Sequence, residues 1–293
     1  MAPLVPDPLR SPLPRERRDS PGAPFPATDP TTDFVAAGQG GADEIPGALR
    51  GALDRLALRW QLGEWAPGQV APRCWRTLVP ARGAIESWNR LRSLADETGC
   101  WPVVIGGPDD EVAHAAALRE SLDSTDALVR DGLVLDVDEW LTDEAAIDPD
   151  LVREVDDGSP FGSARVITHR ILDAPPWRLR RAGNGTLLWV ESPHSWDVPA
   201  ILRFGGWNSC PPTAVHVAML HRWHRRWGAE LVGLSRDRLE VAVARQPRTR
   251  PEALALAREH FLYCEELVLA EHGSIRALAA ALLVSRVWSF RWD

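Results

Sequence analysis

The sequence predicts an α+β fold, with a mixed or antiparallel sheet packed against helices and a disordered, proline-rich N-terminal tail. The chain has 293 residues, of which 45% are hydrophobic and 25% charged, as in globular proteins. Segments of helical and of strand-like periodicity are mixed along the chain, without the regular alternation that predicts a parallel sheet. Fourteen tryptophans, against six phenylalanines and one tyrosine, predict a core built from a few large side chains.

Residues 1–46 form the predicted tail. Ten of the 25 prolines lie there, and a segment of this composition buries too little apolar surface to offset the entropy lost on ordering. Its basic patch (Arg15, Arg17 and Arg18) is interpreted as solvated charge, with docking on an acidic partner as the alternative.

Residues 47–158 are expected to form an N-terminal α/β region. Apolar residues at helical spacing predict helices at 47–60, 84–98 and 109–122. The second helix is closed by Gly99, and the third is capped by Asp109. Apolar or alternating runs predict strands at 76–80, 101–107 and 133–140. The acidic stretch that follows is broken by Pro149 and Gly158, so a boundary is placed near Gly158.

Residues 159–293 are expected to form a C-terminal α+β domain. Strands are predicted at 164–171, 186–191, 229–234, 238–245 and 287–293. Helices are predicted at 212–227, 251–268 and 274–283. In the first of these helices an apolar stripe at i+4 spacing predicts one buried face, made of Val215, Met219, Trp223 and Trp227.

Composition and charge exclude several classes of protein. The 33 basic residues, all arginine, and 41 acidic residues give a formal net charge of −8, so a general nucleic-acid coat is excluded and a nucleic-acid partner is not expected. No window approaches the ~20 apolar residues of a membrane helix. The acidic excess lies in residues 1–150, whereas residues 151–293 carry 19 arginines against 15 acids.

The remaining global features point to a cytoplasmic protein. The four cysteines form no CxxC pair, and the N-terminus lacks the apolar run of a secretory signal, so reduced thiols in a cytoplasm are expected. The absence of lysine, with many Ala, Arg and Pro residues, is typical of high-GC coding. No Walker or dinucleotide-binding glycine pattern is present, so no cofactor is expected.

The stretch 204–212, FGGWNSCPP, has the composition of a constructed site. Its glycines allow close approach of the backbone, Asn208 offers an amide, and Cys210 precedes a helix N-terminus, where a thiol pKa is lowered. A nucleophilic thiol also needs a base, which His216 or His260 would supply through folding. Three interpretations stay open: a structural turn, a contact with a ligand or partner, and a catalytic nucleophile.

The predicted helix 251–268 carries a second group of candidates. Its buried stripe includes Cys264, which is interpreted as a small core residue. Glu259, Tyr263 and Glu266 share an adjacent face. The two glutamates lie roughly 10 Å apart along the helix, too far to share a proton and too far for the carboxyl pair of an inverting glycosidase.

The sequence contains further, weaker candidates for metal binding or catalysis, and a purely structural interpretation is preferred for them. His221 and His224 could bind a metal, but a solvated basic face is preferred. Asp136 and Asp138 could hold Mg²⁺ from one strand face, but an exposed acidic edge is preferred. A further hypothetical metal site would use Cys210, His216, His260 and Cys264. The motif SPHSWD contains the residue types of a Ser-His-Asp catalytic triad (Ser192, His194, Ser195 and Asp197), but the chain has no G-x-S-x-G nucleophile elbow.

The motifs GGWNSCP, WGAELVGLSRDRLEVAV, EALALAREHFLYCEELV and VWSFRWD, in this order, resemble the bacterial family "domain of unknown function 4253". The likeness covers about residues 185–293, with a weaker echo at 98–107. The resemblance marks Trp207, Asn208, Cys210, Pro211, Trp223, Gly228, Ala229, Glu259, Tyr263, Cys264, Trp288, Trp292 and Asp293. The chain departs from the family at 265–266, where Glu-Glu replaces Pro-Asp, and at 270–271, where Ala-Glu replaces Gln-Gly.

The leading hypothesis is a binding or interaction module, with an unknown protein or small molecule as its partner. A regulatory or toxin-neutralising role would rest on fold-level analogy alone. The expected binding surface comprises Trp207, Asn208, Cys210, Glu259, Tyr263, Trp292 and Asp293. The alternative is a hydrolase or transferase that uses Cys210 or the Glu259/Tyr263 pair. Both hypotheses require that the turn 204–212 and the Tyr263 face meet in the folded chain.

Overall fold

The computed structural model describes residues 46–55, 63–65, 73–80, 84–121, 123–156, 158, 161, 164–171 and 184–292. The chain divides into two units, residues 1–40 and residues 41–293, and all described residues lie in the second unit. Apart from Pro46, the predicted tail therefore lies outside the described residues. Among the described helices, none combines the length and the apolar character that crossing a bilayer requires.

The described strands form one seven-stranded sheet, in the order β1-β2-β4-β3-β5-β6-β7. Their bounds are β1 (Gly63–Trp65), β2 (Cys74–Pro80), β3 (Trp101–Val104), β4 (Asn184–Val190), β5 (Ala229–Leu234), β6 (Arg238–Val243) and β7 (Val287–Arg291). Neighbouring strands are antiparallel except β3 and β5, which are parallel at Val104 and Gly233. The predicted α+β class with a mixed sheet is confirmed.

Strand β3 lies at the centre of the sheet, between β4 and β5, and is buried throughout. Strand β5 approaches β3 closely at Gly233. A Cβ atom there would lie 2.6 Å from Ile171 Cδ1 and 3.2 Å from the Val104 carbonyl oxygen. Strands from both sides of Gly158 thus share one sheet, and the division of the chain near Gly158 stays a prediction.

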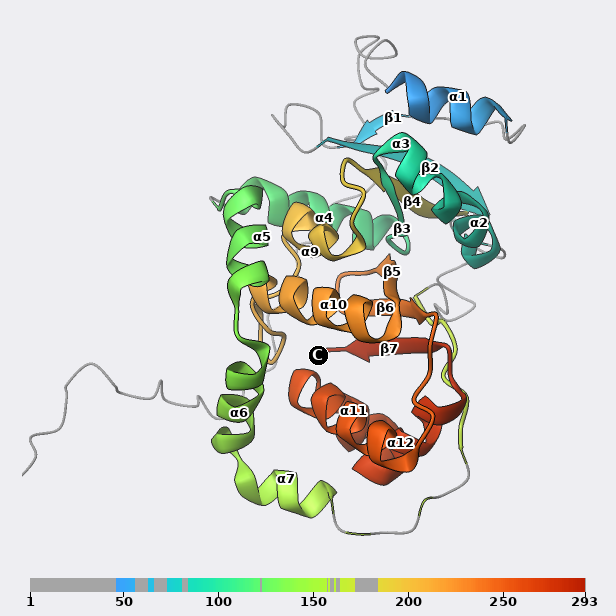
Figure 1. Ribbon diagram of the computed structural model, residues 1–293. Coiled ribbons are helices and arrows are strands. Elements are labelled where there is room, and N and C mark those ends of the chain that lie inside the picture. Colours follow the sequence, from blue (N-terminus) through green and yellow to red (C-terminus); the bar gives the residue numbers. More distant parts are fainter. Residues whose placement is uncertain are drawn as a thin grey trace, which may run out of the picture. The chain divides into compact units, whose positions relative to one another are not determined.

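Helices precede and connect these strands (Figure 1). The α-helices are α1 (Gly47–Arg55), α2 (Ala84–Leu91), α3 (Ala95–Thr98), α4 (Pro108–Glu120), α5 (Thr125–Val134), α6 (Val137–Ile147), α7 (Pro149–Val155), α9 (Val198–Leu202), α10 (Thr213–Trp227), α11 (Arg250–Tyr263) and α12 (Ile275–Val284). Short segments are η1 (Arg92–Leu94), η2 (Ser195–Asp197) and the π-helical η3 (Leu267–His272). Helix α10 packs against α5 and β5, and α11 packs against α12.

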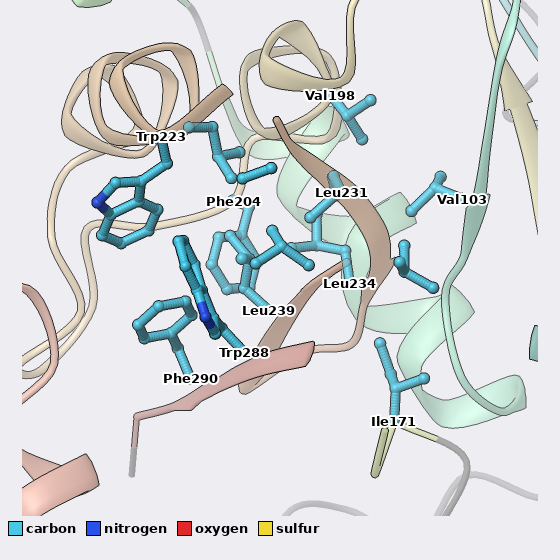
Figure 2. Close-up of a cluster of buried hydrophobic side chains, with 14 of the residues drawn as sticks. Val103, Ile171, Val198, Phe204, Trp223, Leu231, Leu234, Leu239, Trp288 and Phe290 are labelled. Carbon is cyan, nitrogen blue, oxygen red and sulfur yellow. The ribbon is translucent and has the colours of Figure 1, made fainter. Parts of the chain in front are cut away.

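The core is built on tryptophan, as the composition predicts. Figure 2 shows Trp223 of α10 beside Trp288 and Phe290 of β7. The Trp223 and Phe290 rings are stacked, with centroids 5.2 Å apart and planes at 6°, and Trp288 meets Trp223 edge-on at 5.5 Å. The predicted apolar stripe of α10 is confirmed, since Val215, Met219, Trp223 and Trp227 are all buried.

The strand predicted at 133–140 is wrong. This segment contains the end of α5 and the start of α6. Asp136 caps α6, because its Oδ1 accepts hydrogen bonds from the backbone N–H groups of Asp138 (3.0 Å) and Glu139 (3.1 Å). A local cap therefore overrides the alternating pattern, and Asp136 and Asp138 do not share a strand face.

Three other expectations also need correction. Residues 164–171 form no strand, because side chains replace the backbone ladder there: Ile167 N–H donates to Ser285 Oγ, 2.8 Å away. The helix expected at 251–268 ends at Tyr263, since Cys264 has extended dihedral angles. The cap of α4 is Gly107 instead of Asp109, and the Asp110 carboxylate accepts from the Gly107 N–H at 2.9 Å.

Candidate functional site

The turn between α9 and α10 has a backbone that only glycine adopts readily. Gly205 and Gly206 have φ angles of 113° and 85°. A Cβ atom on Gly205 would lie 2.5 Å from the Pro211 carbonyl oxygen and 2.6 Å from the His216 ring. The Gly206 N–H donates to that same carbonyl at 2.8 Å. The double glycine therefore lets the turn close directly over the His216 imidazole.

The two predicted stretches meet through His216. The Cys210 Sγ lies 3.4 Å from His216 Nε2, and the Tyr263 hydroxyl lies 2.6 Å from His216 Nδ1. The three side chains are 4%, 0% and 1% exposed, respectively. We call this hydrogen-bonded series the Cys210–His216–Tyr263 relay. Folding thus brings Cys210 and Tyr263 together, and of the two expected bases it is His216 that reaches the thiol.

Aromatic rings enclose the relay. The His216 ring lies 4.9 Å from Phe204 and 5.4 Å from Trp292, centroid to centroid. Trp292 also meets Tyr263 edge-on at 5.3 Å. Trp292 is 1% exposed, so it belongs to the wall of the relay and not to an exposed surface. Asp293 lies outside the described residues.

Burial keeps each member of the relay neutral. Desolvation lowers the pKa of His216 to about 3, opposed by its hydrogen bond to the Pro211 carbonyl. Desolvation likewise raises the pKa of the Cys210 thiol above its ordinary value, and the nearby Cys264 adds to this effect. The pKa of Tyr263 is raised by the same cause. At neutral pH the relay therefore consists of a thiol, a neutral imidazole and a phenol.

Glu259 lies in a separate polar cluster between α10 and α11. Its Oε2 accepts from Trp223 Nε1 at 3.2 Å, and its Oε1 accepts from Arg226 Nη1 at 2.6 Å and Arg222 Nη2 at 3.1 Å. The Glu259 and Tyr263 residues are 8% and 1% exposed. The expectation of a solvent-facing Glu259/Tyr263 surface therefore needs correction, because this face of α11 packs against α10.

The tip of the turn remains exposed. Gly206, Asn208 and Ser209 are exposed, and Trp207 is half-buried against Phe204, with ring centroids 4.8 Å apart and planes at 88°. Asn208 has a φ angle of 47°, in the left-handed region where asparagine is enriched. Among the predicted site residues that the structure describes, Trp207 and Asn208 are therefore the ones that a partner can reach.

Of the four residues of the hypothetical metal site, Cys210 and His216 contact each other, whereas His260 and Cys264 have other partners. His260 packs against Trp223, Trp288 and Phe290, and Cys264 Sγ donates to the Arg291 carbonyl at 3.1 Å. In the part of the chain that the structure describes, no group of three or more His, Cys, Asp or Glu side chains could hold a metal ion.

The SPHSWD motif forms a local structure, without a nucleophile arrangement. Ser192 Oγ donates to Asp197 Oδ2 at 2.7 Å, and His194 stacks on Trp196 at 4.5 Å and 9°. His221 and His224 of α10 tilt against the same indole, at 5.1 Å and 4.8 Å. The sequence pattern does not reveal this grouping of three histidines, because Trp196 joins them only in the folded chain.

In the C-terminal part of the chain, a glycine turn thus closes over a buried Cys–His–Tyr relay. Residues 186–293 match the family model described as "Domain of unknown function (DUF4253)". The C-terminal part of the chain is therefore similar to this family, and the family match confirms the resemblance noted in the sequence. Comparison with curated proteins and with solved structures found no match in either set.

Proposed function

We propose that the protein is a binding module whose partner contacts the exposed tip of the turn, from Gly206 to Ser209. One observation carries this proposal: the tip lies directly above the neutral, enclosed relay. A turn fixed from below loses little conformational freedom when a partner binds, and this lowers the cost of association. Trp207 offers a large amphipathic ring and Asn208 an amide, both typical of recognition surfaces.

In this proposal the buried residues act as support for the turn. Cys210, Tyr263 and Trp292 hold the floor of the turn, and Glu259 holds α11 against α10. Because these residues are buried, they would affect binding through the geometry of the tip. We also propose a reduced bacterial cytoplasm as the location, which is supported by four free, buried cysteines. The partner would be a protein or a small molecule, and a regulatory or toxin-neutralising role rests on analogy alone.

The alternative is a hydrolase or transferase with Cys210 as nucleophile. The 3.4 Å separation between its Sγ and His216 Nε2 favours it, since a nucleophile needs a base within reach. Burial argues against it, because a raised thiol pKa and a lowered imidazole pKa both oppose the thiolate–imidazolium pair. Glu259 gives no better support, since Trp223, Arg222 and Arg226 occupy its carboxylate.

The proposal is tested by comparing two arginine substitutions in quantitative affinity capture from native cells. Ser209→Arg places a bulky charge on the tip, and Ala255→Arg places the same charge on an exposed position of α11. A binding partner should be captured by the wild-type protein and by Ala255→Arg, and lost with Ser209→Arg. Equal capture by all three proteins, or specific capture by none, would contradict a partner site at the tip.

A further inference from the structure

A pocket of about 290 Å³ lies where residues 164–171, β6, β7 and η3 meet, at a site separate from the turn. It is lined by Arg165, Arg170, Arg238, Glu266, Ala270, Glu271 and Arg291. Four guanidinium groups and two carboxylates give this lining a formal charge of +2. The sequence pattern does not reveal the group, because its arginines come from three separate segments.

Within the lining the arginines outnumber the glutamates, and two further acids, Asp237 and Glu240, lie close to these arginines. Arg291 Nε lies 3.6 Å from Asp237 Oδ2. Among the described residues, the Arg165 and Arg170 guanidinium groups take part in no ion pair with either glutamate of the lining. Like charges gathered in this way repel one another, and a bound anion would relieve that repulsion.

A buried carboxylate sets the positions of two arginines. Glu240 is 0% exposed. Its Oε1 accepts from the Arg170 backbone N–H at 2.6 Å and from Ser289 Oγ at 3.0 Å. Arg238 Nη1 donates to the same Ser289 Oγ at 2.9 Å. One carboxylate thus fixes the backbone of Arg170 and, through Ser289, orients the Arg238 guanidinium.

The same carboxylate explains why residues 164–171 lie beside the sheet without joining it as a strand. His169 Nδ1 lies 3.1 Å from Glu240 Oε2, so two successive residues of the segment are held by Glu240. A buried charge is costly unless its hydrogen-bonding capacity is filled. The hydrogen bonds that Glu240 accepts therefore hold residues 164–171 in place, and this segment carries Arg165 and Arg170 to the pocket.

We propose that this pocket binds a small phosphate monoester that carries hydroxyl or amino groups. Guanidinium forks match the oxygen geometry of a phosphate and bind it more strongly than neutral donors do. Glu266 and Glu271 would accept hydrogen bonds from the hydroxyl or amino groups of the ligand. The pocket volume lies at the lower end of the range for small-molecule sites, which favours a small metabolite over a nucleotide.

The proposal is tested by titration calorimetry with glycerol phosphate, inorganic phosphate and glycerol as probes. The test variant is Arg165→Gln/Arg170→Gln, and the control is Arg90→Gln/Arg248→Gln, which removes the same charge from exposed positions outside the pocket lining. Glycerol phosphate should bind wild type and control within about twofold of each other, and the test variant at least about tenfold more weakly. Glycerol alone should not bind.

A second variant tests the role of the carboxylates. Glu266→Gln/Glu271→Gln should reduce the preference for glycerol phosphate over inorganic phosphate, because the acceptors for the hydroxyl groups are weakened. Far-ultraviolet circular dichroism and the melting temperature establish that each variant folds. The proposal is overturned by an absence of binding at millimolar glycerol phosphate, by equal weakening in test and control variants, or by tighter binding of a phosphopeptide than of glycerol phosphate.

Discussion

At Gly205 the backbone passes so close to His216 that no side chain fits between them. Two separate effects act here: a φ angle of 113° and a clash of a Cβ atom with the imidazole at 2.6 Å. Gly206 has a φ angle of 85°, but a Cβ atom there would meet nothing within 4 Å. The pair therefore separates backbone strain from the steric contact with the relay.

We expect Gly205→Ala to lower the free energy of unfolding by about 3 kcal/mol, as the sum of strain and overpacking. Gly206→Ala should cost only about 1 kcal/mol, from strain alone. Urea unfolding of both variants measures the difference. Equal losses would show that the turn does not close on His216 as described.

The residue scale also shows which part of the site could be predicted. The residue types in FGGWNSCPP indicate a turn before a helix, because glycine pairs have specific backbone consequences. They do not decide whether the turn is structural, a partner contact or a nucleophile site. The partner of Cys210 could only be narrowed to His216 or His260. The folded geometry decides between them, since His216 Nε2 lies 3.4 Å from Cys210 Sγ. The burial of a side chain such as Tyr263 likewise depends on contacts between distant segments.

At the scale of the elements, Glu259 joins α11 to α10. It is buried, and it accepts from Trp223, Arg222 and Arg226. The contrasting pair is Arg153–Asp150 on α7, whose side chains are 74% and 86% exposed. Exposed pairs of this kind contribute little to stability, whereas breaking a buried charged network is costly.

We expect Glu259→Gln to lower the free energy of unfolding by about 2 kcal/mol, because it leaves two arginines and an indole N–H with a weaker acceptor. Asp150→Asn should change it by less than about 0.5 kcal/mol. Guanidinium chloride would screen both pairs, so thermal unfolding at low ionic strength is the suitable measurement. A loss at Glu259 no larger than that at Asp150 would contradict a linking role.

The elements that sequence patterns misassigned share a physical cause. Residues 133–140 alternate like a strand, yet the Asp136 carboxylate forms a helix cap there. Residues 164–171 have strand-forming composition, yet Ser285 and Glu240 accept hydrogen bonds from the backbone N–H groups of Ile167 and Arg170. In both cases a side-chain oxygen, and not a backbone carbonyl, accepts the hydrogen bond from the backbone N–H group. The spacing of apolar residues gives no sign of such a hydrogen bond.

At the scale of the whole molecule, the order of the strands in the sheet is the feature that could not be predicted from the sequence. Strands could be recognised individually, because apolar runs such as 101–104 are local signals. The insertion of β3 between β4 and β5 depends on pairings across more than eighty residues, and no local pattern records them. The class could still be predicted, since it follows from the mixture of element types alone.

The central claim is that the relay is a neutral, enclosed support for the turn and not a catalytic pair. It is tested most directly by the rate of iodoacetamide alkylation of Cys210 as a function of pH, resolved by peptide mass spectrometry. Cys74 is the internal reference, because it is also buried and its thiol pKa is also raised by desolvation.

A raised thiol pKa means that thiolate is scarce at pH 7 and grows as the pH increases beyond the ordinary thiol range. We therefore predict that Cys210 reacts no faster than Cys74 at neutral pH, that its rate shows no plateau below pH 9, and that His216→Gln does not slow it. Rapid alkylation of Cys210 at pH 7 that His216→Gln abolishes would contradict the claim and establish an activated nucleophile.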